Sequence, residues 1–157
     1  MVDVTEAPES PARAFVQIFK DGWSSPTPDA FVAHFLPWMH PDLRATMPME
    51  PVAVGHEGFR DQFRRVFALF PNLRGTVNRA TVDGNVLVIE VELTATLGGK
   101  PMAWTAQDRF TFAGDKVKER ITSFNPVPLL VAVLTRPSAW AAWWRSGVGP
   151  PRRRVRS

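Results

Sequence analysis

The 157-residue sequence has no cysteine, no tyrosine and only three histidines. Without cysteine the chain has no disulfide, thiolate metal site or cysteine nucleophile, and without tyrosine it lacks a common phenolic acid. No apolar run is long enough to span a bilayer, and no charged segment followed by an apolar one begins the chain. The histidines, aspartates and glutamates show no spacing typical of a metal site. We therefore expect a cytoplasmic protein without a bound metal.

The net charge of +4 comes entirely from the end of the chain. Residues 1–149 contain 15 Lys and Arg against 15 Asp and Glu. The excess consists of four arginines, Arg152, Arg153, Arg154 and Arg156. We expect residues 149–157 to form a disordered basic tail, and a weak contact of this tail with an anionic membrane or a nucleic acid is the less favoured alternative. Because the folded part is neutral overall, we expect no nucleic-acid partner.

Helix signals dominate the first half of the sequence. Residues 1–9 are unpatterned and are expected to be flexible. Ser10-Pro11 and Thr27-Pro28 each place a capping residue before a proline, which predicts two helix starts. From Phe59 onward, apolar residues recur at i, i+4, i+7, i+8 and i+11, which predicts a third helix. Residues 43–47 alternate between two prolines and predict a short strand.

The second half changes to a period of two. Four alternating runs, at 73–82, 85–96, 101–113 and 116–125, are separated by Asp-Gly, Gly-Gly and Gly-Asp pairs typical of hairpin turns. They predict an antiparallel meander. The expected fold is therefore α+β, with a cone-shaped, curved antiparallel sheet, three N-terminal helices packed over it and a C-terminal helical extension. We assign residues 10–125 to this domain and 126–148 to the extension.

One strand carries an unusual acid. Trp104, Ala106, Asp108, Phe110 and Phe112 share one face of the run 104–112, and Asp108 is the only carboxyl among them. A buried acid needs a partner or a function. A three-residue turn at 113–115 would place Arg120 opposite Asp108, where its guanidinium would hold the acid as an ionised carboxylate. A structural ion pair, a catalytic base and a ligand anchor are three open roles for this pair.

The same alternation predicts a hydrophobic cavity between the sheet and the helices. Its expected ligand is a flat polycyclic or terpenoid molecule, and His34 could line it, although a histidine satisfied within its helix is favoured. The predicted lining residues are Phe15, His34, Trp38, Met47, Phe63, Phe67, Val91, Leu93, Trp104, Phe110, Thr122 and Phe124.

Several motifs resemble the nuclear transport factor 2-like superfamily, in its SnoaL-like and ketosteroid-isomerase-like branch. They are Pro41-Asp42-Leu43, Gly55 with Phe59 and Phe63, Phe70-Pro71-Asn72-Leu73, Val82-Asp83-Gly84-Asn85-Val86, Asp108-Arg109-Phe110-Thr111-Phe112, Lys116-Val117 and Phe124. The resemblance covers about residues 11–125 and implies that Asp108 matches the acid/base of SnoaL-like polyketide cyclases. This scaffold hosts isomerases, cyclases, hydrolases and non-enzymes, so the fold does not fix the activity.

Other catalytic positions implied by the resemblance carry apolar or neutral residues. The general base and the oxyanion tyrosine of the steroid isomerases fall on Met47 and Phe15. The catalytic triad of the limonene-epoxide hydrolases falls on Val91, Leu93 and Thr122. Neither of those mechanisms is therefore available to this chain.

We expect a cofactor-free enzyme, because general acid/base chemistry needs no cofactor. Asp108 would move a proton on a hydrophobic carbonyl compound, in an isomerisation or cyclisation, and Arg120 would orient Asp108 or steady an enolate. The alternative is a non-catalytic module that binds a hydrophobic ligand or dimerises through its sheet. A homodimer is the expected assembly. The Trp140, Trp143 and Trp144 stripe predicts docking on the body or a partner protomer, with weak membrane-surface contact as the minor alternative.

Overall fold

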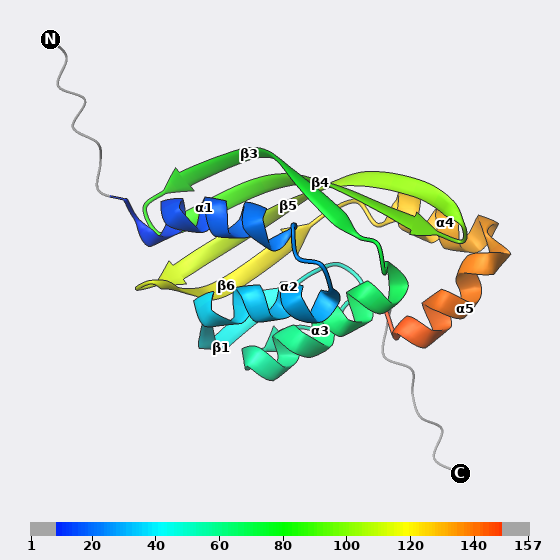
Figure 1. Cartoon of the computed structure of the whole chain (residues 1–157), viewed down its shortest axis with the longest axis horizontal. Helices are drawn as coiled ribbons and strands as arrows, with labels where there is room; N and C mark the ends of the chain where they lie inside the picture. Colours follow the sequence, from blue (N-terminus) through cyan, green and yellow to red (C-terminus); the bar gives the residue numbers. More distant parts are fainter. Residues whose placement is uncertain (1–8, 149–157) are drawn as a thin grey trace, which may run out of the picture.

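A computed structural model describes residues 9–148 (Figure 1). Its elements in chain order are α1 (Pro11–Gly22), α2 (Pro28–Phe35), the 3₁₀ turn η1 (Leu36–Trp38), β1 (Met39–Thr46), β2 (Ala53–Val54), α3 (Gly55–Leu69), β3 (Arg74–Asp83), β4 (Val86–Leu97), β5 (Lys100–Ala113), β6 (Lys116–Ser123), α4 (Val127–Thr135) and α5 (Pro137–Ser146). The α+β class is confirmed. The predictions for the first eight residues and for the basic tail fall outside the described residues.

The two predicted helix starts are confirmed in atomic detail. The Ser10 hydroxyl accepts a hydrogen bond from the Arg13 amide at 3.2 Å, and the Thr27 hydroxyl accepts one from the Ala30 amide at 3.1 Å. In each helix a proline occupies the first turn, where its missing amide hydrogen costs nothing. These caps fix where α1 and α2 begin, and therefore which of their residues face the sheet.

The six strands form one sheet in the order β2-β1-β6-β5-β4-β3. Strands β3 to β6 form the predicted antiparallel meander, but β1 pairs with β6 in parallel, so the sheet is mixed and not wholly antiparallel. A parallel pair needs a long connection, and here α3 and four strands lie between its two members. Strand β1 also begins at Met39, earlier than predicted, because Pro41 lies in an irregular part of the ladder that needs no amide hydrogen.

The β5–β6 hairpin has a different register from the predicted one. The turn contains only two residues between the paired Ala113 and Lys116, and Gly114 supplies the required positive φ of 62°. A bulge near Thr111 then shifts the register further, so Asp108 lies opposite Thr122. The total shift is two residues. Asp108 therefore stays on the same face as Arg120, which is its diagonal neighbour.

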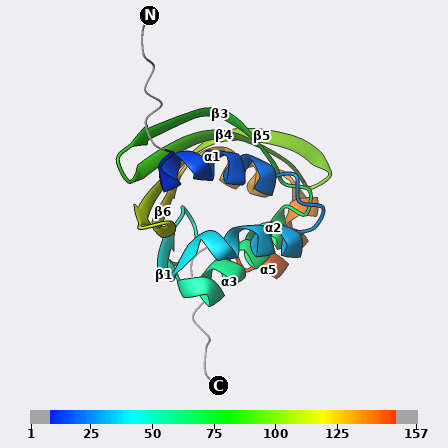
Figure 2. The same cartoon turned by 60° about the vertical axis from the view of Figure 1, so that its left-hand side comes forward.

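The helices cover the concave side of the curved sheet, with α1 under β3 to β5 and with α2 and α3 closing the opposite side (Figure 2). Ten of the eleven phenylalanines are buried between these layers. The ring centroids of Phe15 and Phe110 are 5.0 Å apart, and those of Phe31 and Phe63 are 5.1 Å apart. This aromatic core holds the helices at a fixed distance from the strands.

The C-terminal helices α4 and α5 pack at one end of the body (Figure 1). The Ser138 hydroxyl donates to the Gly98 carbonyl at 2.9 Å, and an Arg136 guanidinium nitrogen donates to the Leu97 carbonyl at 3.0 Å. Trp143 is half-buried against the core, whereas 49% of Trp140 is exposed. Within residues 9–148, no helix combines the length and the apolar character that a membrane span requires.

Candidate active site

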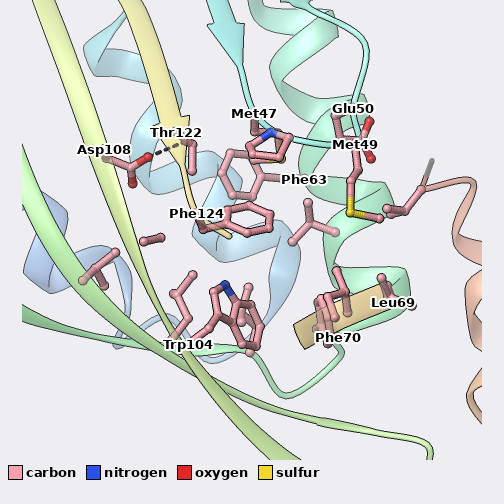
Figure 3. A pocket seen from close by; sticks show the side chains of 18 of the residues that line it. Met47, Met49, Glu50, Phe63, Leu69, Phe70, Trp104, Asp108, Thr122 and Phe124 are labelled. Atoms are coloured by element: carbon pink, nitrogen blue, oxygen red, sulfur yellow. Dashed lines mark hydrogen bonds between the residues drawn. The ribbon is translucent and has the colours of Figure 1, made fainter. Parts of the chain in front are cut away.

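A cavity of about 70 Å³ lies between the sheet, α3, the loop after β1 and the C-terminal segment (Figure 3). Its lining residues are mainly apolar, and the polar groups among them are three charged side chains, Glu50, Asp108 and Arg120, the hydroxyl of Thr122 and the indole nitrogens of Trp23 and Trp104. The space exceeds that of one water molecule several times over. Its composition is typical of a site for a small, mainly hydrophobic molecule.

Most of the predicted cavity residues line this space. They come from three neighbouring strands, from α3 and from the segments that follow β1 and β6, and their inward positions follow from the two-residue period of the strands. The predicted residues found there are Met47, Phe63, Val91, Leu93, Trp104, Asp108, Arg120, Thr122 and Phe124. The structure thus brings Asp108 and Arg120 together with seven of the expected ligand contacts.

Five predicted residues do not line the cavity: Phe15, His34, Trp38, Phe67 and Phe110. Phe15 and Phe110 pack against each other in the aromatic core, and Phe110 borders only a smaller neighbouring space. Phe67 is buried against other phenylalanine rings. Trp38 is 38% exposed at the end of η1. Phe15, Phe67 and Phe110 point inward as predicted, but the aromatic core fills the space that they border.

His34 is satisfied within the helical layer. Its Nε2 lies 2.7 Å from the Ile18 carbonyl oxygen, and its ring meets the Phe35 ring edge-on. This hydrogen bond ties α2 to α1. The favoured sequence interpretation, a histidine with a structural partner, therefore describes its position better than a cavity role.

Asp108 is buried on β5, with 2% of its surface exposed. Its Oδ2 accepts a hydrogen bond from Arg120 Nη2 at 3.1 Å, and its Oδ1 accepts a short one from the Thr122 hydroxyl. Figure 3 shows the contact with Thr122 at one side of the cavity. An ionised carboxylate has about four acceptor sites, so two remain after these bonds. Asp108 is thus oriented from both oxygens and still has capacity to accept a proton or a ligand hydrogen.

Arg120 is also buried and adds a free donor to the site. Its guanidinium carbon lies 5.1 Å from the centre of the Phe63 ring and 5.9 Å from that of Phe110, in cation–π geometry. Its second terminal nitrogen, Nη1, is buried without a hydrogen-bond partner among the described residues. A buried donor of this kind suits a negative charge that develops on a bound molecule.

The structure adds a second carboxyl that the sequence patterns did not identify. Glu50 belongs to the loop between β1 and β2, and its side chain is only 1% exposed. Its Oε2 accepts a hydrogen bond from Arg65 Nε of α3 at 2.8 Å. Burial raises the pKa of the Glu50 carboxyl above its usual 4.5, although the hydrogen bond and the charge of Arg65 act in the opposite direction. Its Oε1 has no partner among the described residues.

Unpartnered polar atoms gather at this cavity. Among the described residues, five buried side-chain atoms lack a hydrogen-bond partner, and four of them belong to residues that line the cavity. These four are Trp23 Nε1, Glu50 Oε1, Trp104 Nε1 and Arg120 Nη1. Buried polar groups are almost always paired. Their concentration here indicates that the cavity is built to hydrogen-bond a molecule as well as to enclose it.

Several apolar lining residues were also missed. Trp23 follows α1 and lies so close to Gly75 that a Cβ there would come within 2.5 Å of the indole. Leu129 and Val148 come from the C-terminal segment. No sequence period links these residues to the sheet, because their position depends on how helices far apart in the chain pack together. The glycine opposite Trp23 is the one signal that could have indicated a close approach.

No group of three or more His, Asp or Glu side chains in the described part of the chain could hold a metal ion.

Comparison with known proteins supports the fold. A family model described as the SnoaL-like domain matches residues 13–120. Among solved structures, a candidate SnoaL-like polyketide cyclase from Jannaschia sp. CCS1 is similar at a TM-score of 0.72 and 20% identity, covering 83% of this chain and 96% of that one. TerC, co-crystallised with polyporic acid, has a TM-score of 0.68 at 17% identity, with coverage of 80% and 100%.

An NTF2-like protein of unknown function from Burkholderia pseudomallei has a TM-score of 0.67 at 14% identity, covering 79% of this chain and 98% of that one. No curated protein sequence matches the chain. At these identities the solved structures establish the shared fold.

Proposed function

The chain belongs to the SnoaL-like domain family, and from this premise we propose that it is a cofactor-independent enzyme. It performs acid/base chemistry of the isomerase or cyclase type on a hydrophobic carbonyl compound. The observation that carries this proposal is the position of Asp108: a buried carboxyl that lines an apolar cavity and keeps unused acceptor sites. A carboxylate in such a site is suited to take a proton from carbon.

In the proposed mechanism, the carbonyl compound binds with an acidic C–H bond against Asp108. The carboxylate takes this proton, and the electron pair of the C–H bond moves onto the carbonyl oxygen as an enolate. Arg120 Nη1, which has no partner among the described residues, donates a hydrogen bond to the developing charge. Protonated Asp108 then returns the proton to another carbon in an isomerisation. In a cyclisation, the enolate carbon attacks a second carbonyl, and protonated Asp108 returns the proton to the alkoxide that forms.

Thr122 and the other terminal nitrogen of Arg120 hold the Asp108 carboxylate at its two oxygens. This support fixes the direction of the base before the substrate binds, which lowers the reorganisation needed during proton transfer. The apolar walls hold the hydrocarbon part of the substrate and exclude water. Similar folds described with a polyketide cyclase role or bound to polyporic acid support a small organic molecule as the ligand class. We place this activity in the cytoplasm.

Hydrogen–deuterium exchange tests the proposal without knowledge of the natural substrate. In deuterated water, 1-tetralone and 2-tetralone should exchange the hydrogens next to their carbonyl faster with the protein than without it, as followed by proton NMR. Asp108→Asn should reduce this catalysed exchange by about 10²- to 10⁴-fold, the usual contribution of a general base. Its circular dichroism spectrum should match that of the wild type.

The matched control is Asp115→Asn, which neutralises an exposed carboxyl at the β5–β6 turn. It should leave the exchange unchanged. Equal exchange by the wild type and Asp108→Asn would contradict the proposal, as would no catalysed exchange with either ketone.

A second candidate function is a non-catalytic module that binds a hydrophobic ligand or dimerises through its sheet. The observation that favours it is that both oxygens of Asp108 already accept hydrogen bonds within the protein, as expected of a structural ion pair. This function predicts tetralone binding without exchange, or a dimer in analytical ultracentrifugation that does not depend on Asp108. Exchange and binding measurements on one sample separate the two functions.

A further inference from the structure

Glu50 forms a second polar end of the cavity, distant from Asp108. Figure 3 shows Asp108 and Thr122 at one side and Glu50 at the other, with Phe63 and Phe124 between them. The two carboxyls come from different elements, β5 and the loop after β1. The proposed proton transfer uses only the Asp108 end. It gives no role to a buried carboxyl on the opposite wall.

The position of Glu50 is built by several independent features. Arg65 of α3 holds one oxygen of the carboxyl at 2.8 Å. The preceding residue, Met49, has a φ of 69°, and it is the one non-glycine residue with a positive φ in the described part of the chain. Such a conformation is uncommon for a methionine, and here it belongs to a turn that the Glu50 amide closes by donating to the Met47 carbonyl at 3.4 Å. This turn places Glu50 on the cavity wall.

The remaining oxygen, Oε1, is buried and has no hydrogen-bond partner among the described residues. Glu50 also lines the cavity, and an ion pair with Arg65 does not by itself require that position. Burial without a partner is unfavourable for a carboxyl oxygen. A hydroxyl or carbonyl group of a bound molecule would relieve it, because Oε1 accepts from a hydroxyl and, when protonated, donates to a carbonyl.

We propose that Glu50 Oε1 binds an oxygen-bearing group of the ligand at the end of the cavity away from Asp108. The ligand is then an elongated, mainly apolar ring system with an oxygen function near each end. One oxygen lies at the Asp108 and Arg120 pair and the other at Glu50, while the rings contact the apolar walls. Glu50 is a binding residue in this arrangement and sets the specificity for doubly oxygenated molecules. The inference rests on the proposed function only because both require the cavity to accept an apolar ring system.

The test compares the affinities of 2-naphthol and 2,6-dihydroxynaphthalene by isothermal titration calorimetry. In the wild type, the second hydroxyl should increase affinity about five- to tenfold, as expected for one additional buried hydrogen bond. Glu50→Met, which keeps the length of the side chain but removes its polar atoms, should abolish this gain. Glu50→Gln, which keeps the shape and hydrogen-bonding groups, should retain it to within about twofold.

Glu57→Met is the matched control, because Glu57 is an exposed carboxyl on α3 whose side chain is 85% accessible. It should leave the gain from the second hydroxyl unchanged. If Glu50→Met does not fold, the double variant Glu50→Met/Arg65→Met removes the carboxyl together with the arginine that pairs with it, and it serves the same comparison.

A gain that persists after removal of the Glu50 carboxyl would overturn the inference and leave the proposed function intact. Equal affinity of the wild type for both naphthols would do the same. If neither molecule binds the wild type, the inference and the proposed ligand class both fail, whereas the tetralone exchange still measures the catalytic role of Asp108 separately.

Discussion

The two ends of the cavity each pair a buried carboxyl with an arginine, but the chain supports them differently. Asp108 lies in the middle of β5, and two neighbouring groups of β6 engage both of its oxygens. Glu50 lies in a loop beside Met49, whose φ is positive, and within residues 9–148 only Arg65 engages one of its oxygens. A regular sheet fixes the first carboxyl, whereas the second depends on a loop that spans two prolines.

This difference separates two tasks. A group that transfers protons needs a fixed direction, which strand pairing and two hydrogen bonds provide at Asp108. A group that recognises a ligand benefits from a free hydrogen-bonding atom, which Glu50 retains. The experiments below test whether the two ends differ in this way.

The largest difference should appear when each arginine is removed. Arg120→Met leaves the buried Asp108 without its cation and should cost roughly 3–5 kcal/mol in the free energy of unfolding. Arg65→Met should cost less, because the Arg65 side chain is 20% exposed and its pair with Glu50 is therefore better solvated than the pair of Arg120 and Asp108. Urea denaturation at neutral pH measures both values. Equal losses of unfolding free energy in Arg120→Met and Arg65→Met would contradict the proposed difference between the two ends of the cavity.

The Thr122 hydroxyl should contribute a smaller amount at the Asp108 end. Thr122→Val keeps the shape of the side chain and deletes one hydrogen bond to the carboxylate. We expect a loss of about 1.5–3 kcal/mol in the free energy of unfolding, as for hydrogen bonds to charged groups. Thr94→Val, at an exposed position of β4, is the control and should change stability little. If Thr122→Val leaves the free energy of unfolding unchanged, Arg120 alone orients Asp108.

The smallest effect should be a pH dependence confined to the Glu50 end. Because the pKa of Glu50 is raised in the folded state, the folded protein binds more protons than the unfolded one between the ordinary pKa of 4.5 and the raised value. The stabilisation is therefore complete below pH 4.5 and is lost as the pH rises through the raised pKa. Glu50→Gln cannot ionise and should gain stability relative to the wild type over that interval, by about 1.4 kcal/mol for each unit of pKa shift.

Thermal unfolding of both proteins in a pH series from 4 to 8 would reveal this change. A constant difference between the wild type and Glu50→Gln across the series would show that Glu50 ionises in the folded protein as it does in the unfolded chain. The Glu50 end would then contribute no pH dependence to the stability of the protein.

Much of the Asp108 end could be predicted from the sequence, because regular strands obey a simple period. Alternation placed Asp108 on the buried face, and the hairpin signals paired it with Arg120. The predicted residue opposite Asp108 was wrong, because the Gly-Asp pair forms a two-residue turn instead of the predicted three-residue one, and the bulge near Thr111 leaves no distinct trace in the sequence. The predicted ion pair is nevertheless confirmed, because a shift of two residues keeps both side chains on the same face of the sheet.

The Glu50 end could not be predicted in this way. The segment from Pro48 to Pro51 has no periodicity, and the burial of Glu50 depends on Arg65, fifteen residues further along. The contribution of Leu129 likewise follows from the packing of α4 and not from a local pattern. For Phe15 the inward direction was predictable from the sequence. Whether its ring borders a cavity or packs against other rings depends on the whole core, and here it packs against Phe110 and Phe112.

A crystal structure of the wild-type protein with 2,6-dihydroxynaphthalene tests the central claim most directly. The account predicts that the ring system lies in the cavity between Phe63 and Trp104, with one hydroxyl within hydrogen-bonding distance of Asp108 and the other on the Glu50 side. A molecule bound outside the cavity, or one bound inside it without contact to Asp108, would contradict the account.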